Sequence, residues 1–166
     1  MAGGAHRLSA PRLPPDFANL FVCLNEAGAE YMLVGGYAVM IYGYLRTTQA
    51  LDVWVHATPG NAARVMQAMT EFGLPPGLSL DVLGQIDGSP PTGFRFGRSP
   101  FAVDLLTSVR GVSFNEAWPE SVVRSFDGVS VRVISRRALL QNKRSTGRPK
   151  DAADVEALER LGDLST

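Results

Sequence analysis

The feature that most constrains this chain is a short apolar run that ends in two glycines. Tyr31–Val34 has the length and composition of a buried strand, and it leads through Gly35-Gly36 into a helix-like stretch, Tyr37–Tyr42. Glycines at a strand-to-helix junction let backbone amides and the start of the helix approach phosphate oxygens. The junction therefore predicts an anion-binding turn, and a merely tight turn is the alternative that uses the same residues.

The rest of the chain alternates between strand patterns and helix patterns. Short apolar runs predict strands at Leu51–His56, Leu80–Leu83 and Phe101–Leu106, the second of them weak. Two alternating runs around Asp127-Gly128 predict a hairpin. Helical spacing and capping residues predict helices that begin near Asp16, Thr58, Ser135 and Pro149. The predicted class is α/β or α+β, with a small mixed β-sheet flanked by helices.

Length and composition fit a single compact domain. The chain has 166 residues, 45% of them hydrophobic, and we expect a flexible segment at 1–15 followed by one domain at 16–166. Basic and acidic residues number 16 each, which argues against a protein that coats nucleic acid without specificity. The lone Cys23 excludes an internal disulfide and a cysteine zinc site. The lack of long apolar runs predicts a cytoplasmic protein with no membrane segment.

Two aspartates interrupt the apolar strands, and each is costly to bury without a partner. Asp52 lies in the strand predicted at Leu51–His56, and Asp104 lies in the one predicted at Phe101–Leu106. Magnesium prefers hard oxygen ligands, so carboxylates that converge from neighbouring strands would hold it. Alternate strand residues share a face, which puts positions 50 and 52 together and lets an adjacent strand add Asp104. A structural ion pair, for example between Asp52 and Arg46, is the alternative.

Three separated segments, taken in order, resemble one known family. They are Val34-Gly35-Gly36-Tyr37-Ala38-Val39 with Arg46, Thr48 and Asp52-Val53-Trp54-Val55; then Val103-Asp104-Leu105-Leu106; then Lys143 with Gly147-Arg148-Pro149-Lys150-Asp151 and Asp154. The ordered set resembles the minimal nucleotidyltransferases of the polymerase-beta-like superfamily, over about Tyr31 to Leu158. Relatives of this kind often belong to toxin–antitoxin or phage-defence pairs.

The resemblance implies a nucleotidyltransferase fold and a reaction that uses a nucleoside triphosphate with Mg²⁺ or Mn²⁺. The family's metal ligands would fall on position 50, Asp52 and Asp104, and the last would also help activate the attacking hydroxyl. The nucleotide would contact residues spread over the domain: Gly35, Gly36, Arg46, Thr48, Lys143, Arg148 and Asp151. The implied partners are an RNA, such as a tRNA end, or a protein as acceptor, and a cognate antitoxin or toxin.

The residues alone leave a second interpretation for part of this set. Lys143 and Arg148 could equally belong to a solvated helix end, and Asp151 could be a favourable acid at a helix start.

Position 50 departs from the family pattern, because Ala50 stands where an acidic residue is expected. An alanine methyl cannot bind magnesium, so the chain as written is expected to be inactive or impaired. Either a catalytic acid was replaced deliberately, which the otherwise intact signature favours, or the chain is a natural degenerate member. We therefore expect a nucleotidyltransferase that moves an NMP group to an RNA or protein hydroxyl. The alternative is a non-catalytic module that binds nucleotides or acts as an antitoxin-like partner.

Overall fold

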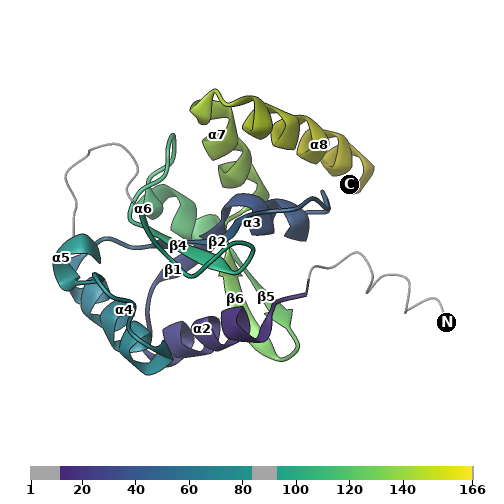
Figure 1. Cartoon of the computed structure of the whole chain (residues 1–166). Helices are drawn as coiled ribbons and strands as arrows, with labels where there is room; N and C mark the ends of the chain where they lie inside the picture. Colours follow the sequence, from purple (N-terminus) through teal and green to yellow (C-terminus); the bar gives the residue numbers. More distant parts are fainter. Residues whose placement is uncertain (1–11, 84–92, 166) are drawn as a thin grey trace.

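The computed structural model describes residues 12–83 and 93–165, and it shows a six-stranded mixed sheet with helices on both faces (Figure 1). This arrangement confirms the predicted fold class. Helix α2 (Pro15–Glu26) begins at the last position of the segment predicted to be flexible, 1–15. Residues 1–11 of that segment lie outside the described residues, so its flexibility stays a prediction.

The sheet brings strands that are distant in sequence side by side. From one edge to the other they are β3 (Gly93–Phe96), β4 (Ala102–Leu106), β2 (Ala50–Val55), β1 (Tyr31–Val34), β6 (Val129–Val133) and β5 (Val122–Phe126). β2 is parallel to β4 and β1 is parallel to β6, whereas the other neighbours are antiparallel. Paired residues of neighbouring strands point to the same face of a sheet, which matters for the site described below.

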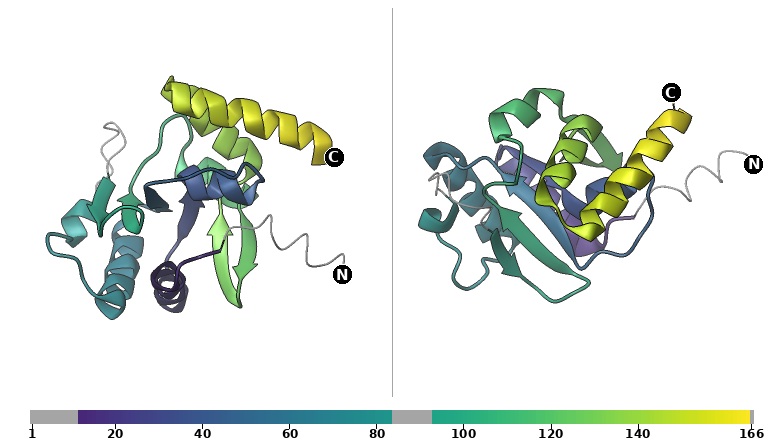
Figure 2. Two further views of the ribbon diagram at one scale, coloured as in Figure 1. Left: turned by 45° about the vertical axis from the view of Figure 1, so that its right-hand side comes forward. Right: turned by 90° about the horizontal axis from the view of Figure 1, so that it is seen from above.

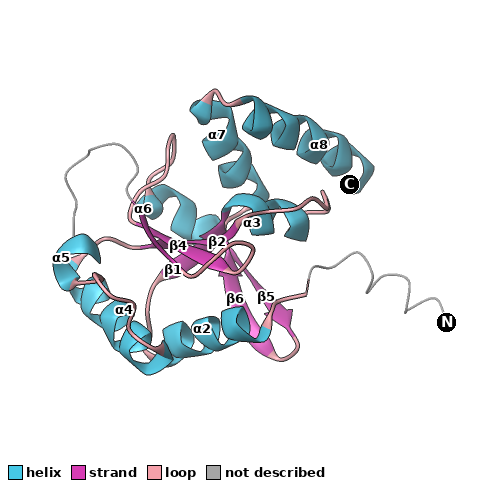
Figure 3. Ribbon diagram, in the orientation of Figure 1, coloured by secondary structure: helices cyan, strands magenta, loops and turns pink. Residues whose placement is uncertain are grey.

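The helices form a layer on each face of the sheet. Besides α2 they are α3 (Gly35–Ile41), α4 (Pro59–Phe72), α5 (Leu80–Leu83), α6 (Phe114–Ala117), α7 (Arg136–Thr146) and α8 (Pro149–Ser165), with a 3-10 turn η1 (Trp118–Glu120). α2 and α4 pack together on one face, and α3 and α7 lie on the other (Figure 3). α8 packs on α7 on the outer side of that second layer, as both views of Figure 2 show. No helix within 12–83 or 93–165 is long and apolar enough to cross a membrane.

Capping and turn residues account for several of these boundaries. Thr58 and Ser135 each accept a hydrogen bond from the backbone N–H three residues later, at 3.2 and 3.1 Å, and so begin α4 and α7. Asp127 and Gly128 have φ values of 52° and 86°, the left-handed pair that a two-residue hairpin between β5 and β6 requires. The predicted helix starts and the predicted hairpin are therefore confirmed.

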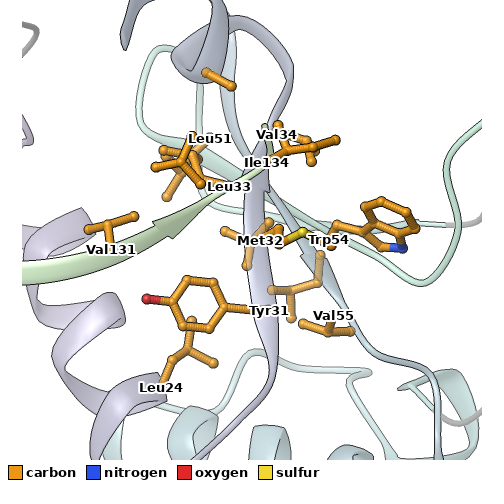
Figure 4. Close-up of a cluster of buried hydrophobic side chains, with 14 of the residues drawn as sticks. Leu24, Tyr31, Met32, Leu33, Val34, Leu51, Trp54, Val55, Val131 and Ile134 are labelled. Atoms are coloured by element: carbon orange, nitrogen blue, oxygen red, sulfur yellow. The ribbon is translucent and has the colours of Figure 1, made fainter. Parts of the chain in front are cut away.

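Buried side chains of the central strands form the core. Figure 4 shows Met32, Leu33 and Trp54 among the apolar side chains packed around β1. Trp54 is fully buried and meets Phe114 edge to face, with ring centroids 5.2 Å apart. Large aromatic side chains bury much apolar surface, so this pair stabilises the sheet close to the candidate site.

Two segments differ from the sequence prediction. Leu80–Leu83 is a short helix and not a strand, because its two leucines recur three residues apart and only Leu83 is fully buried. The edge strand Gly93–Phe96 was not predicted, because none of its side chains is fully buried and its apolar signal is weak. The strand predicted from Phe101 begins one residue later, at Ala102, and the Phe101 side chain is 58% exposed.

Candidate functional site

Asp52 and Asp104 lie at the same level of two neighbouring parallel strands. They are register partners in the β2–β4 pair, so both side chains project from the same face of the sheet. Both line a cleft of about 590 Å³. The other described residues that line it come from the β1–α3 junction, the end of β4 and the segment after it, and α7 with the loop that follows: Val34, Gly35, Leu106, Ser108, Val109, Arg110, Asn142, Lys143, Thr146 and Arg148.

The β1–α3 junction packs its two glycines against these elements. Val34 is the register partner of Asp52, and Gly35 follows with a φ of 68°, a left-handed conformation that favours glycine. A Cβ on Gly35 would clash with Oδ2 of Asp52 and would lie 2.9 Å from its Cγ. A Cβ on Gly36 would lie 2.7 Å from Oγ1 of Thr48. Close packing therefore requires glycine at both positions, even before any ligand is considered.

The surroundings of Asp52 favour the protonated form of its carboxyl. Burial, and next the neighbouring Asp104, raise the pKa of Asp52 to about 7, although Lys143 and Arg95 act in the opposite direction. Two ionised carboxylates in one partly buried site repel each other, and a cation between them would relieve that repulsion.

Asp104 has a cationic partner in the free protein. Arg95 on the edge strand β3 is its register partner, and it donates from Nε to Oδ1 and from Nη2 to Oδ2, both at 2.8 Å. The pair is thus bidentate and engages both oxygens of the carboxylate. Sequence reasoning missed Arg95, although the alternation in Gly93–Phe96 is a strand pattern that could have placed it.

Ala50 lies two residues before Asp52 on β2 and therefore on the same face of the sheet. Its register partner on β4 is Ala102, its carbonyl accepts a hydrogen bond from Oγ1 of Thr48 at 3.2 Å, and its methyl is buried. Ala50 is not among the described residues that line the cleft. Within the described ranges no three or more His, Cys, Asp or Glu side chains form a group that could hold a metal ion.

The donor set of the cleft therefore consists of Asp52 and Asp104. Mg²⁺ is commonly bound by one or two carboxylates together with substrate phosphates and water, so this pair fits one divalent cation. A second cation would need the third carboxylate, which Ala50 does not supply.

Lys143 lines the cleft and also belongs to a buried ion network. Its Nζ donates to Oδ1 of Asp151 at 2.9 Å and lies 3.1 Å from Oδ2 of Asp154, and the three side chains are at most 6% exposed. The interpretation of Lys143 as part of a solvated helix end is therefore wrong, and α7 continues beyond it to Thr146. Burial favours the neutral form of Asp151, but hydrogen bonds from Thr146 and from two cations outweigh it and lower the pKa of Asp151 to about 2.

The same network includes two arginines singled out from the sequence. Arg46 donates from Nε and Nη2 to the two oxygens of Asp154, each at 2.8 Å, so the alternative of an ion pair between Arg46 and Asp52 is wrong. Arg148 donates from Nε to Oδ2 of Asp151 at 2.7 Å, and its side chain is 71% exposed beside the cleft.

The structure separates the predicted nucleotide contacts into two groups. Gly35, Lys143 and Arg148 line the cleft, whereas the others pack or pair beside it: Gly36, Arg46, Thr48 and Asp151. Sequence reasoning assigned no role to the lining residues at 108–110, which follow the carboxyl end of β4, a usual place for ligand contacts in open α/β sheets. Asn142 on α7 holds this segment by donating to the Arg110 carbonyl at 2.8 Å.

A solved structure with the same fold is that of the lincosamide antibiotic adenylyltransferase LnuA, bound to lincomycin. It aligns with a TM-score of 0.55 over 90% of this chain and 98% of that chain, at 12% sequence identity. The likeness confirms the predicted nucleotidyltransferase fold. No family model and no curated protein matches the sequence.

Proposed function

We propose that the cleft binds a nucleoside triphosphate and that the protein belongs to a reaction class in which an NMP group moves to an acceptor hydroxyl. The observation that carries this proposal is the pair Asp52 and Asp104, in register on parallel strands and facing one cleft beside the Gly35 turn. The fold shared with an adenylyltransferase supports the same chemistry. A nearly buried cation in the cleft wall, Lys143, suits a polyphosphate.

Asp52 and Asp104 would hold one Mg²⁺ or Mn²⁺, which when bound would neutralise charge on the triphosphate. Lys143 adds a positive charge in a fixed place, because two carboxylates hold its Nζ. The exposed side chains of Arg110 and Arg148 add charges at the cleft that can turn toward phosphate oxygens. Asp104 is the group we assign to accept the proton of the hydroxyl as its oxygen attacks the α-phosphorus and pyrophosphate leaves.

Ala50 limits this activity in the chain as written. With two carboxylates, one cation can be held, whereas two-metal phosphoryl transfer stabilises both the attacking and the leaving oxygens. We therefore propose that transfer is impaired and that nucleotide binding persists. The second candidate function, a non-catalytic nucleotide-binding or antitoxin-like module, is favoured by a specific observation: Asp104 is bound to Arg95 in the free protein.

The acceptor follows from the resemblance and not from the cleft. An RNA end such as that of a tRNA, or a protein side chain, is the proposed acceptor, in a cytoplasmic toxin–antitoxin or defence pair. The structural neighbour is an adenylyltransferase for a lincosamide antibiotic, so a small-molecule hydroxyl belongs among the acceptors tested.

Calorimetric titration of the common ribonucleoside triphosphates, with and without Mg²⁺, tests the binding site. We expect the wild-type protein to bind at least one triphosphate, and Mg²⁺ to strengthen that binding. The variant Asp52→Asn should lose the strengthening by Mg²⁺, because a carboxamide is a much poorer magnesium ligand. The matched variant Asp16→Asn makes the same chemical change at an exposed residue of α2 and should bind as the wild type does.

Two results would contradict the proposal. One is a folded wild-type protein that binds none of the triphosphates. The other is an equal loss of binding in Asp16→Asn and Asp52→Asn, because this would show that the effect does not arise in the cleft.

A further inference from the structure

Arg95 is a cation in direct contact with a candidate metal ligand, and it reaches that ligand from the edge of the sheet. Its two hydrogen bonds to Asp104, each 2.8 Å long, engage both carboxylate oxygens. The Arg95 side chain is 56% exposed, whereas that of Asp104 is 18% exposed. Since β3 is an edge strand, the guanidinium can leave Asp104 toward solvent without unpacking the core.

The geometry sets Arg95 against a divalent cation. A metal ion shared by Asp52 and Asp104 would bind the oxygens that the guanidinium now engages, and the two positive groups would repel each other at that distance. Lys143 differs in this respect, because it is buried and held by two other carboxylates. Arg95 is therefore the cation that a metal ion would have to displace.

We propose that Arg95 and a divalent cation are alternative partners of Asp104, and that the triphosphate favours the exchange by giving the displaced guanidinium phosphate oxygens to bind. The exchange at Asp104 stands on the geometry of Arg95, whereas the part played by the triphosphate rests on the function proposed above. Guanidinium groups bind carboxylate and phosphate with the same bidentate geometry, so a released Arg95 has an equivalent partner at hand. The free protein then binds the bare cation weakly and binds the cation with nucleotide more strongly.

Mn²⁺ binding in the absence of nucleotide, followed by electron paramagnetic resonance and calorimetry, tests the exchange. The variant Arg95→Gln should bind Mn²⁺ about five- to tenfold more tightly than the wild type, since a partly exposed bidentate pair contributes on the order of 1 kcal/mol. Arg95→Lys keeps the charge without the bidentate geometry and should fall between the two. Arg64→Gln, which changes an exposed arginine on α4, should match the wild type. The double variant Arg95→Gln with Asp104→Asn should lose the gain.

The outcomes separate this proposal from the function on which part of it rests. Equal or weaker Mn²⁺ binding in both Arg95 variants, with thermal unfolding curves that show folded proteins, overturns the exchange even if the wild type binds ATP. Tighter Mn²⁺ binding in Arg95→Gln supports the exchange even if no nucleotide binds, in which case only the proposed function fails. When ATP does bind, it should raise Mn²⁺ affinity more in the wild type than in Arg95→Gln, and the reverse order overturns the part played by the triphosphate.

Discussion

Gly28 and Gly35 have the same backbone conformation in different surroundings. Their φ values are 69° and 68°, so an alanine at either position would adopt the same disfavoured left-handed conformation, at a cost of about 1 kcal/mol. A Cβ at Gly28 would meet nothing within 4 Å, whereas a Cβ at Gly35 would clash with the Asp52 carboxylate. The two positions therefore separate backbone strain from steric conflict in the cleft.

We expect Gly35→Ala to destabilise the fold by about 1–3 kcal/mol more than Gly28→Ala, and to weaken ATP binding strongly. The methyl would push the Asp52 side chain out of its position beside Asp104. Chemical denaturation and ATP titration of both variants measure the two effects. ATP binding by Gly35→Ala at wild-type affinity would show that the turn does not form part of the site.

Position 50 offers a gain-of-function prediction. Ala50→Asp should raise Mg²⁺-dependent nucleotidyl transfer by roughly 100-fold or more, because the third carboxylate lets a second cation stabilise charge that develops in the transition state. Labelled triphosphates incubated with Mg²⁺ and cellular RNA, protein or small-molecule acceptors provide the assay. In the metal-free state the same change should lower stability or leave it unchanged, since it adds a negative charge beside Asp52 and Asp104.

Ala50→Asn is the matched control for this experiment. It has nearly the shape of the aspartate variant but lacks the charge, so it should stay as inactive as the wild type. Equal transfer by the wild type, Ala50→Asp and Ala50→Asn would refute the role assigned to position 50, and activity in both variants would show that shape and not charge matters.

Single residues were predictable from the sequence where burial alone makes them costly. Asp52 and Asp104 stand out because an acid within an apolar strand needs a partner. The partner of Arg46 was not predictable, since Asp154 lies 108 positions away and only the packing of α8 brings the two together. Arg95 was missed for the related reason that its strand was not predicted.

At the scale of elements, the buried network decides how the C-terminal helix is attached. Lys143 on α7 and Arg46 in the segment before β2 both pair with Asp154 on α8, so one carboxylate links three parts of the fold. A buried carboxylate with two cationic partners leaves both cations uncompensated when it is removed. Attachment of α8 is therefore expected to depend on this side chain more than on the exposed ion pairs of the same helix.

We expect Asp154→Ala to destabilise the protein by about 3–5 kcal/mol in chemical denaturation. The exposed pair between Arg144 and Glu159, 2.9 Å long and also joining α7 to α8, provides the comparison, and Glu159→Ala should cost less than about 1 kcal/mol. If the two variants lose the same stability, the buried network does not hold the helix in place. A double variant of Asp154 and Lys143 should be less destabilised than the sum of its single variants, because the two charges share one environment.

Elements with strong local signals were predicted with nearly correct ends. Strand β1 coincides with the predicted Tyr31–Val34, and α4 and α7 begin where their capping residues stand. The errors concern weak signals: a single helical turn at Leu80–Leu83 has too few residues to distinguish helix from strand, and β3 is an edge strand that buries little. Tertiary contacts, and not local preference, decide such segments.

The whole molecule shows what residue patterns cannot reach. The sheet pairs β1 with β6, so that Leu33 lies against Val133, a hundred positions later, and it pairs β2 in parallel with β4 across the intervening helices. Hydrophobic periodicity says which residues are buried but not which strands become neighbours. The adjacency of Asp52 and Asp104 was predicted only because a shared cation would require both carboxylates.

The stability of the metal-free protein should depend on pH through two aspartates that act in opposite directions. The folded pKa of Asp151 is lowered from 3.8 to about 2, so its contribution to stability is complete above pH 3.8 and is lost as the pH falls toward 2. The folded pKa of Asp52 is raised from 3.8 to about 7, so its ionisation costs nothing below pH 3.8 and costs most above pH 7. Taken together, the two groups place the stability maximum between these windows, at about pH 4 to 5.

Denaturation curves in EDTA for the wild type, Asp151→Asn and Asp52→Asn across this range separate the two effects. Asp151→Asn should be less stable than the wild type at neutral pH, and the difference should shrink by on the order of 1–2 kcal/mol as the pH falls from about 4 to 2, because the wild-type carboxyl then also becomes neutral. Asp52→Asn should gain stability relative to the wild type as the pH rises from about 4 to 7. A constant difference for Asp151→Asn across the acid range would mean that its hydrogen bonds do not favour the charged form. A constant difference for Asp52→Asn would mean that Asp52 and Asp104 do not repel each other in the free protein, and the electrostatic reason for a cation between them would be lost.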